Sequence, residues 1–165
     1  MSSTIFLETD DFHLSKVGEN VILNTDIQGL SLLMFYSPKC VHSTQLLPKF
    51  KKLSNSINNC VFGIINVSNN KRVILMSEKT ATPIRHVPYI ILYLNGQPYM
   101  IYNGSHTEQE LRTFVIEIAN KLSKNDRGKF STDSRTKPDY SFGVPLWGKL
   151  GSSYLTDTTA YNSIK

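Results

Sequence analysis

Residues 30–53 read LSLLMFYSPKCVHSTQLLPKFKKL, and this stretch decides the fold. Its first seven residues are a continuous apolar run of strand length, which predicts a strand buried on both faces. From Cys40 to Asn55 the pattern turns helical, with apolar residues spaced for one face at Leu46, Leu47, Phe50 and Leu53. Pro48 inside this pattern predicts a kink rather than a helix end. The pattern therefore places a thiol where a buried strand gives way to a helix.

Outward from this stretch, short apolar runs alternate with helical patterns. Further strands are predicted at Thr4–Glu8, Cys60–Val67, Tyr89–Leu94 and Pro98–Tyr102. A short helix is predicted around Asp11–Lys16 and another within residues 69–82, whereas residues 18–29 are predicted to be a connector. The expected order is β-α-β-α-β-α-β-β-α, which indicates an α/β fold with a mixed central β-sheet flanked by helices.

Two local signals support the second half of this order. Asn95-Gly96 separates two apolar runs and favours positive φ at both central turn positions, so an antiparallel hairpin is expected. Thr107 and Glu110 form a capping-box pattern ahead of a last helix, whose apolar stripe is Leu111, Phe114, Val115, Ile118 and Leu122.

Composition restricts the class of protein. The 165 residues carry a formal net charge of +5, but the basic residues form no dense run, so a solvated basic face is favoured over a nucleic-acid site. No apolar stretch approaches the roughly 18 residues of a membrane span, and the N-terminus has no signal-peptide pattern. A cytoplasmic protein is expected. Two cysteines make neither a disulfide framework nor a zinc site.

The amino-acid composition of the chain changes after Leu122. Residues 1–122 are expected to form one domain, and residues 123–165 a C-terminal extension rich in Ser, Lys, Asp and Gly. Scattered apolar side chains make this tail unlike an inert linker: Tyr140, Phe142, Val144, Leu146, Trp147, Leu150, Tyr154 and Leu155. The tail is expected to dock on its own domain or on a partner.

The segment FYSPKCVHSTQLLPKFKKL resembles the active-site segment of thioredoxin-like domains, and most closely that of the protein disulfide isomerase branch, FYAPWCGHCKxLAPxxxxL. His86-Val87-Pro88-Tyr89 and the following strand resemble the family's segment around a cis proline that lies against the reactive cysteine. Gly104 and the last helix also match in order. The resemblance covers residues 4–122 and implies a thioredoxin fold. Degenerate single-domain relatives with apolar tails also look similar to virion-associated proteins of large DNA viruses.

Three departures bear on chemistry. Ser43 stands where the family has its resolving cysteine, so the motif is CxxS. Met34 stands where thioredoxins often carry a buried acid that serves proton transfer. Lys39 replaces a tryptophan before the reactive cysteine. The first two remove parts needed for dithiol turnover, so at most a monothiol disulfide-exchange activity is expected.

Cys40 is the candidate nucleophile, because backbone N–H groups at a helix start stabilise a thiolate. Ser43 can donate a hydrogen bond to that thiolate, and His42 adds positive charge. As the resemblance implies, Val87 beside a cis Pro88 would pair with an extended peptide by β-strand addition; Tyr36 and Lys39 complete the expected substrate-binding surface. Cys60 is expected to be a core cysteine. A metal on Cys40, His42 and His86 has poor ligand geometry, and no cofactor is expected.

Two functions from different classes remain open. One is thiol–disulfide exchange with mixed-disulfide retention of a protein partner, through Cys40 and the Pro88 loop. The other is a structural or adaptor role, for instance in a virion or capsid, with the tail as the contact surface. A monothiol glutaredoxin-like protein fits less well, because the Gly-Gly step after the hairpin is absent. No nucleic acid, membrane span or oligomeric state is predicted.

Overall fold

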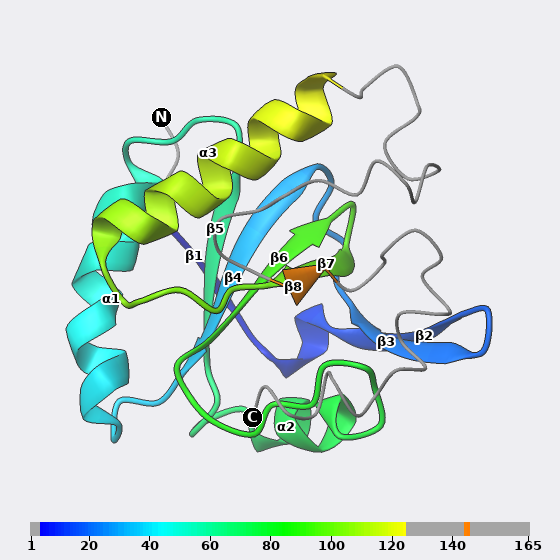
Figure 1. Ribbon diagram of the computed structural model, residues 1–165. Coiled ribbons are helices and arrows are strands. Elements are labelled where there is room, and N and C mark those ends of the chain that lie inside the picture. The colour runs from blue at the N-terminus through cyan, green and yellow to red at the C-terminus, as the bar shows by residue number, and fades with distance from the viewer. Residues whose placement is uncertain (1–3, 125–143, 146–165) are drawn as a thin grey trace.

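The structure is a computed structural model, and it describes residues 4–124 and 144–145 (Figure 1). The strands are β1 (Ile5–Leu7), β2 (His13–Val17), β3 (Asn20–Asn24), β4 (Leu30–Tyr36), β5 (Val61–Asn66), β6 (Tyr89–Leu94), β7 (Gln97–Ile101) and β8 (Val144–Pro145). The helices are α1 (Val41–Ser54), α2 (Lys71–Ser77) and α3 (Glu108–Lys124), with a 3-10 turn η1 (Thr9–Asp11).

Six strands make one mixed sheet in the order β1-β5-β4-β6-β7-β8. β5 runs parallel to both β1 and β4, whereas β4–β6, β6–β7 and β7–β8 are antiparallel pairs. The predicted mixed sheet with a terminal antiparallel hairpin is confirmed. The central strands β4, β5 and β6 are buried along most of their length, as continuous apolar runs require.

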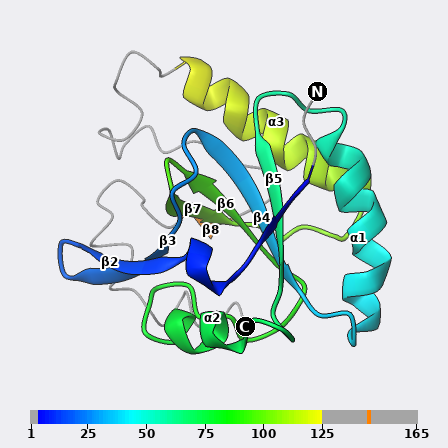
Figure 2. The same ribbon diagram turned by 180° about the vertical axis from the view of Figure 1, so that it is seen from behind.

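Alternating side chains of the sheet feed two separate cores. On β4, Leu32 and Met34 face a core shared with α1 and α3, while Leu33 and Phe35 face a core shared with α2 and β3. Figure 1 shows α3 crossing the sheet beside α1, and Figure 2 shows the sheet from behind. The molecule thus has three layers, with helices on both faces of the sheet.

The parallel pair β4–β5 separates the two cysteines. Tyr36 at the end of β4 lies opposite Asn66 at the end of β5, so Cys40 lies beyond one edge of the sheet and Cys60 precedes β5 at the other. Six strand residues span about 20 Å, well beyond the roughly 7 Å between bridged Cα atoms. Cys60 is 3% exposed, and burial raises the pKa of its thiol to about 12. The prediction of a core cysteine is confirmed.

The predicted helix at Asp11–Lys16 is wrong, and the connector at residues 18–29, whose structure the sequence left uncertain, contains a strand. These residues form β2 and β3, which pair from His13–Asn24 to Val17–Asn20. Gly18 has φ of 65° and opens the two-residue turn between them, a conformation that glycine adopts without steric cost. Tertiary contact decides the outcome, because Ile22 and Leu23 on β3 are fully buried.

The other local signals hold in part or in full. Asn95 and Gly96 both have positive φ, 51° and 84°, as the predicted hairpin turn requires. The N–H of Glu110 donates to Thr107 Oγ1 at 3.2 Å, which is one half of the predicted capping box. The Glu110 carboxylate instead accepts the Ser105 N–H at 2.7 Å, and this bond lowers the pKa of Glu110. α1 continues through Pro48, and α2 lies within residues 69–82, both as predicted.

Of the C-terminal tail, only β8 is described. Val144 pairs with Ile101 and Pro145 with Met100, so β8 extends the sheet beyond β7. The remaining apolar tail residues lie outside the described part of the chain, and docking of the whole tail stays a prediction. No helix within the described ranges is long and apolar enough to cross a bilayer.

Candidate functional site

Cys40 is the N-cap residue of α1. Its backbone is extended, with φ of −102° and ψ of 123°, and its carbonyl accepts the Thr44 N–H at 3.0 Å as the first bond of the helix. Its own N–H donates to Ser37 O at 3.0 Å, which closes a turn between the end of β4 and the helix. The N–H groups of the first helical turn have no partner within the helix, so they are available to the Cys40 side chain.

The surroundings of the Cys40 sulfur favour its anion. The backbone N–H of Ser43 is the main group that lowers the pKa of Cys40; burial opposes it, and the Ser43 side chain and the His42 backbone also lower it. The thiol is partly exposed, so a partner can reach it. A lowered pKa with partial exposure is typical of reactive rather than structural cysteines.

Ser43 is fully buried and connects the sulfur to the turn before it. Its Oγ accepts the Ser37 N–H at 3.3 Å, and its side chain also lowers the pKa of Cys40. Ser37 is in turn held by Ser68, with 2.7 Å between the two Oγ atoms, and its Oγ accepts the Lys39 N–H at 3.2 Å. The predicted helper residue is therefore in contact with the thiol, and a hydrogen-bonded turn fixes its position.

The Val87–Pro88 loop lies against the sulfur, as predicted. The peptide bond between these residues is cis, and the thiol donates to Val87 O at 3.5 Å. Within residues 4–124 and 144–145, nothing accepts a hydrogen bond from the Val87 N–H. The half-buried Val87 therefore contacts the thiol through its carbonyl, and its N–H has no partner among the described residues.

The remaining predicted site residues are spread around the thiol. Lys39 and His42 are exposed on either side of it. Tyr36 is half-buried and packs against the core that α1 and α3 share. Met34 is fully buried in the same core, so no carboxyl group stands at that position. The binding roles of Tyr36 and Lys39 stay predictions.

His106, which the sequence predicts to be a surface residue, is exposed, and the structure adds it to the group of basic residues near the site. His106 follows β7, and burial lowers its pKa, with further lowering from His42, His86 and Lys49. Lys49 Nζ also donates to His106 O at 3.4 Å. The predicted hairpin could have indicated where His106 lies. Because β7 runs antiparallel to β6, the end of β7 lies beside the start of β6, next to Pro88.

A pocket of about 230 Å³ opens beside the cis proline. His86 and His106 line it together with the backbone and side chains of Pro88, Tyr89, Ile90, Ile101, Tyr102, Asn103 and Gly104. The His86 ring stands edge-on to the Tyr89 ring at 5.3 Å, which supports one side of the opening. The pocket is therefore apolar at Ile90 and Ile101 and polar at its two histidines.

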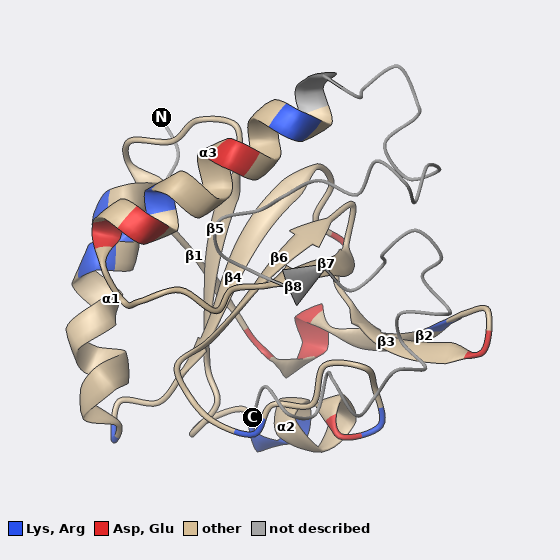
Figure 3. Ribbon diagram, viewed as in Figure 1, with Lys and Arg blue, Asp and Glu red and all other residues tan. Residues whose placement is uncertain are grey.

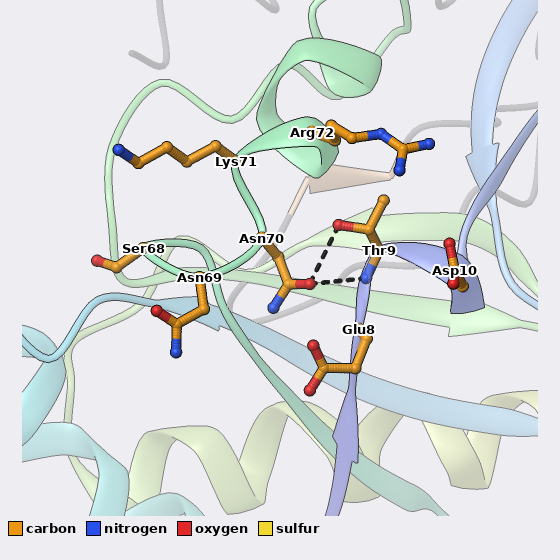
Figure 4. Close-up of a pocket in the computed structure, with 8 residues that line it drawn as sticks. All are labelled: Glu8, Thr9, Asp10, Ser68, Asn69, Asn70, Lys71 and Arg72. Atoms are coloured by element: carbon orange, nitrogen blue, oxygen red, sulfur yellow. Dashed lines mark hydrogen bonds between the residues drawn. The ribbon is translucent and has the colours of Figure 1, made fainter.

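A second, more open hollow of about 700 Å³ lies where η1 meets the loop before α2 (Figure 4). Asn70 ties its two sides together, because its Oδ1 accepts the Thr9 N–H at 2.9 Å and the Thr9 hydroxyl at 3.1 Å. Its Nδ2 donates to Asn66 O at 3.0 Å. Glu8 and Asp10 line the hollow together with Lys71 and Arg72, so it has no single charge preference. It serves as a structural junction.

No group of three or more His, Cys, Asp and Glu side chains in the described residues is arranged to hold a metal ion. What the site offers chemically is a stabilised thiolate, an unused backbone donor and a rim of basic side chains.

Comparisons with known proteins agree with this geometry. The sequence profile of the family described as Thioredoxin matches residues 16–117. Among solved structures, the zinc-bound form of human ERp44 superposes with a TM-score of 0.53 at 18% identity, over 78% of this chain and 37% of that one. This similarity concerns the fold, and the chain spans little more than a third of that protein's length.

Sequence relatives come from two sources. "Uncharacterized protein 196R" of Invertebrate iridescent virus 6 is 38% identical over 73% of this chain and 74% of its own length. "Uncharacterized protein 020R" of Invertebrate iridescent virus 3 is 27% identical over 95% of both chains. "Protein disulfide isomerase-like 1-5" of Oryza sativa subsp. japonica is 23% identical over 74% of this chain, which spans only 23% of that protein.

Proposed function

The chain belongs to the thioredoxin family, and from that premise we propose that it acts through one reactive thiol, Cys40, which forms mixed disulfides with protein partners and retains them. The observation that carries this proposal is the set of donors around the sulfur. The Ser43 and His42 N–H groups and the Ser43 hydroxyl lower the pKa of Cys40, and a lowered thiol pKa raises the fraction of nucleophilic thiolate near neutral pH.

The chemical step is an exchange without net oxidation. The Cys40 thiolate attacks one sulfur of a partner's disulfide, a new S–S bond forms to Cys40, and the partner's S–S bond breaks. The released partner thiolate takes a proton from water. One S–S bond forms for each one that breaks, so the number of disulfides is unchanged and no further oxidant or reductant is needed.

Release is the slow half of the cycle. The Ser43 hydroxyl occupies the position of a resolving thiol, and it cannot displace a partner from a disulfide. Cys60 lies beyond the opposite edge of the sheet, and Met34 provides no acid for proton transfer. An external thiol must therefore free the partner, and this requirement favours retention over rapid turnover.

The Pro88 loop provides the docking surface for the partner's backbone. The Val87 N–H is unused in the described chain and lies next to the sulfur, where an extended peptide can accept its hydrogen bond. Such pairing places the partner's disulfide over Cys40 before the exchange.

The test measures the rate of Cys40 alkylation against pH in a Cys60→Ala variant, which leaves one thiol. An inflection clearly below the roughly 8.5 of an ordinary thiol is expected. In parallel, mixed disulfides are trapped in lysate by rapid acid quenching, with Cys40→Ser as the control. A thiol that titrates at about 8.5 or higher, together with no partner trapped beyond the control, refutes the proposal.

A structural or adaptor role, for example within a virion, is the second candidate. One observation favours it: the similarity to the iridescent virus 3 protein spans 95% of this chain and so continues through most of the C-terminal tail. In this case partners would associate through the tail, without Cys40. Loss of partner association on deleting residues 125–165, with no effect of Cys40→Ser, would favour the adaptor role over exchange.

A further inference from the structure

Three of the four histidines of the chain gather around Cys40. His42 belongs to the first turn of α1, His86 precedes the cis proline, and His106 follows β7; the pKa of His106 is lowered by both of the others and by Lys49 on α1. The fourth, His13, lies on the β2–β3 hairpin near Asp26. Elements far apart in sequence thus bring one kind of side chain to one place.

In the part of the chain that the structure describes, no carboxylate is paired with this group. None of the ion pairs in the described ranges includes His42, Lys49, His86 or His106. The nearest acidic residues along the chain are on α3, and they have other partners: Glu108 lies 3.8 Å from Lys52 and 3.7 Å from Arg112, and Glu110 accepts the Ser105 N–H. Figure 3 shows these opposite charges side by side where α1 meets α3. His42, Lys49, His86 and His106, called the basic rim below, are therefore free of acidic partners among the described residues and available to bind an external anion.

The basic rim also borders a pocket. The 230 Å³ pocket between His86 and His106 is open to solvent and wide enough for one side chain, and it lies beside Pro88 on the loop that contacts the Cys40 sulfur. A peptide paired with the Val87 N–H would run past this opening, with a neighbouring side chain directed toward it.

We propose that this rim selects partner peptides that carry Asp or Glu beside their reactive cysteine, and that the pocket between His86 and His106 receives one such acidic side chain. The inference rests on the proposed exchange at Cys40 and specifies its substrate class. Lys49 contributes an ammonium group to the rim, and the imidazole of His106 carries a charge only when it is protonated.

The histidines make this selection depend on pH. In the free protein, burial and the neighbouring His42, His86 and Lys49 lower the pKa of His106 from its usual 6.5, which favours the neutral imidazole. A bound carboxylate stabilises the charged imidazole and raises that pKa, so binding takes up a proton. Preference for acidic peptides therefore strengthens as the pH falls through about 6.5 to 5, and weakens again below about 4.5, when the peptide carboxylates protonate.

The experiment uses three peptides of equal length whose single cysteine is joined by a disulfide to thionitrobenzoate, with Asp, Asn or Lys on both sides of the cysteine. Release of the coloured thiolate gives the rate of attack by Cys40 in the full chain. Rates are divided by the rate with a small uncharged disulfide at the same pH, which removes the effect of thiolate fraction. At low salt and pH 5.5, the Asp peptide is expected to react about tenfold faster than the Asn peptide, and high salt removes the difference.

Histidine variants identify the source of the preference. His106→Gln and His86→Gln are each expected to reduce the Asp-to-Asn ratio severalfold at pH 5.5, whereas His13→Gln, the matched control, leaves it unchanged. His106→Lys places a lysine ammonium at this position, so its ratio is expected to depend less on pH between 5 and 8 than that of the parent chain. Equal rates for all three peptides at low salt, or loss of the preference in His13→Gln, overturn the inference.

A separate measurement distinguishes failure of this inference from failure of the exchange function. Fluorescence anisotropy of labelled, cysteine-free Asp and Asn peptides is followed with the Cys40→Ser protein. Tighter binding of the Asp peptide at pH 5.5 supports the rim even if Cys40 proves unreactive. Equal binding of both peptides contradicts it even if Cys40 reacts with disulfides.

Discussion

At the residue scale, the Ser43 backbone lowers the pKa of Cys40 more than the Ser43 side chain does. The Ser43 N–H lowers the pKa of Cys40 most, and this group survives any substitution other than proline. The hydroxyl adds a smaller effect and also holds the Ser37 N–H. Ser43 is therefore part of the thiolate site even though it cannot act as a resolving group.

Ser43→Ala is expected to raise the pKa of Cys40 and to slow its alkylation at pH 7 by about threefold to tenfold, because one donor to the anion is lost. The pH–rate profile shifts toward higher pH, while the limiting rate at high pH is retained. Thr44→Ala is the control, since the Thr44 hydroxyl donates to Val41 O and not to the sulfur. An unchanged profile for Ser43→Ala would show that the side chain plays no part.

Ser43→Cys tests the missing resolver directly. The position is fully buried against the Cys40 sulfur, so a thiol there can attack a mixed disulfide from within. Trapped partner complexes are expected to shorten in lifetime by at least about tenfold without added thiol, and an intramolecular disulfide forms as the partner leaves. Mass spectrometry of the released protein detects that bond. Complexes that persist as in the parent chain would place the barrier in proton transfer, where Met34 replaces an acid.

Cys40 was predicted from a local signal, the strand-to-helix junction, and Pro88 from the resemblance of His86-Val87-Pro88-Tyr89 to the cis-proline segment of thioredoxin-like domains. His106 could not be assigned in the same way. Its neighbours His42, Lys49 and His86 lie at least 20 residues away along the chain, and only the paired β6 and β7 bring them together. Residues that act through distant neighbours need the fold before they can be recognised.

At the element scale, the strong turn and cap signals were reliable and the weak ones were not. Asn95-Gly96 encodes its own positive φ values, so the β6–β7 hairpin was predictable. The β2–β3 hairpin was missed because HLSKV has neither β-branched nor aromatic density, and Gly18-Glu19 is a weaker turn signal. Ile22 and Leu23 are fully buried, and Leu23 packs in a core most of whose other residues lie far away along the chain; this burial stabilises the hairpin.

Substitutions at two glycines distinguish the free-energy cost of backbone strain from that of a close contact. Both have positive φ, but a Cβ on Gly96 would lie 2.2 Å from the Thr25 carbonyl oxygen, whereas a Cβ on Gly18 meets nothing within 4 Å. Gly18→Ala is expected to cost about 1–2 kcal/mol from the left-handed backbone alone. Gly96→Ala is expected to cost a further 1–3 kcal/mol, about the cost of overpacking. Urea unfolding of both variants measures the difference, and equal losses would contradict the close approach of β6–β7 to Thr25.

At the scale of the whole molecule, the pairing of β4 with β6 brings the turn at Cys40 beside the Pro88 loop. β4 and β6 are antiparallel neighbours, with Phe35 opposite Tyr89, so the end of one lies beside the start of the other. The turn that follows β4 and the loop that precedes β6 therefore meet at one edge of the sheet. This edge is supported on both faces, by Leu46 of α1 in one core and Val73 of α2 in the other.

The same view predicts how far the C-terminal tail matters for folding. Every buried apolar side chain of the described residues lies between Leu7 and Ile118. In the part of the tail that the structure describes, β8 adds two residues to the sheet on the outer side of β7. A chain that ends at residue 124 is therefore expected to fold, with a free energy of unfolding within about 1–2 kcal/mol of the full chain, since two edge residues contribute few hydrogen bonds. Urea unfolding monitored by circular dichroism measures this change, and hydrogen exchange at Ile101 reports whether β7 has lost its neighbour. A much larger loss, or failure to fold, would mean that residues 125–165 belong to the domain rather than extend it.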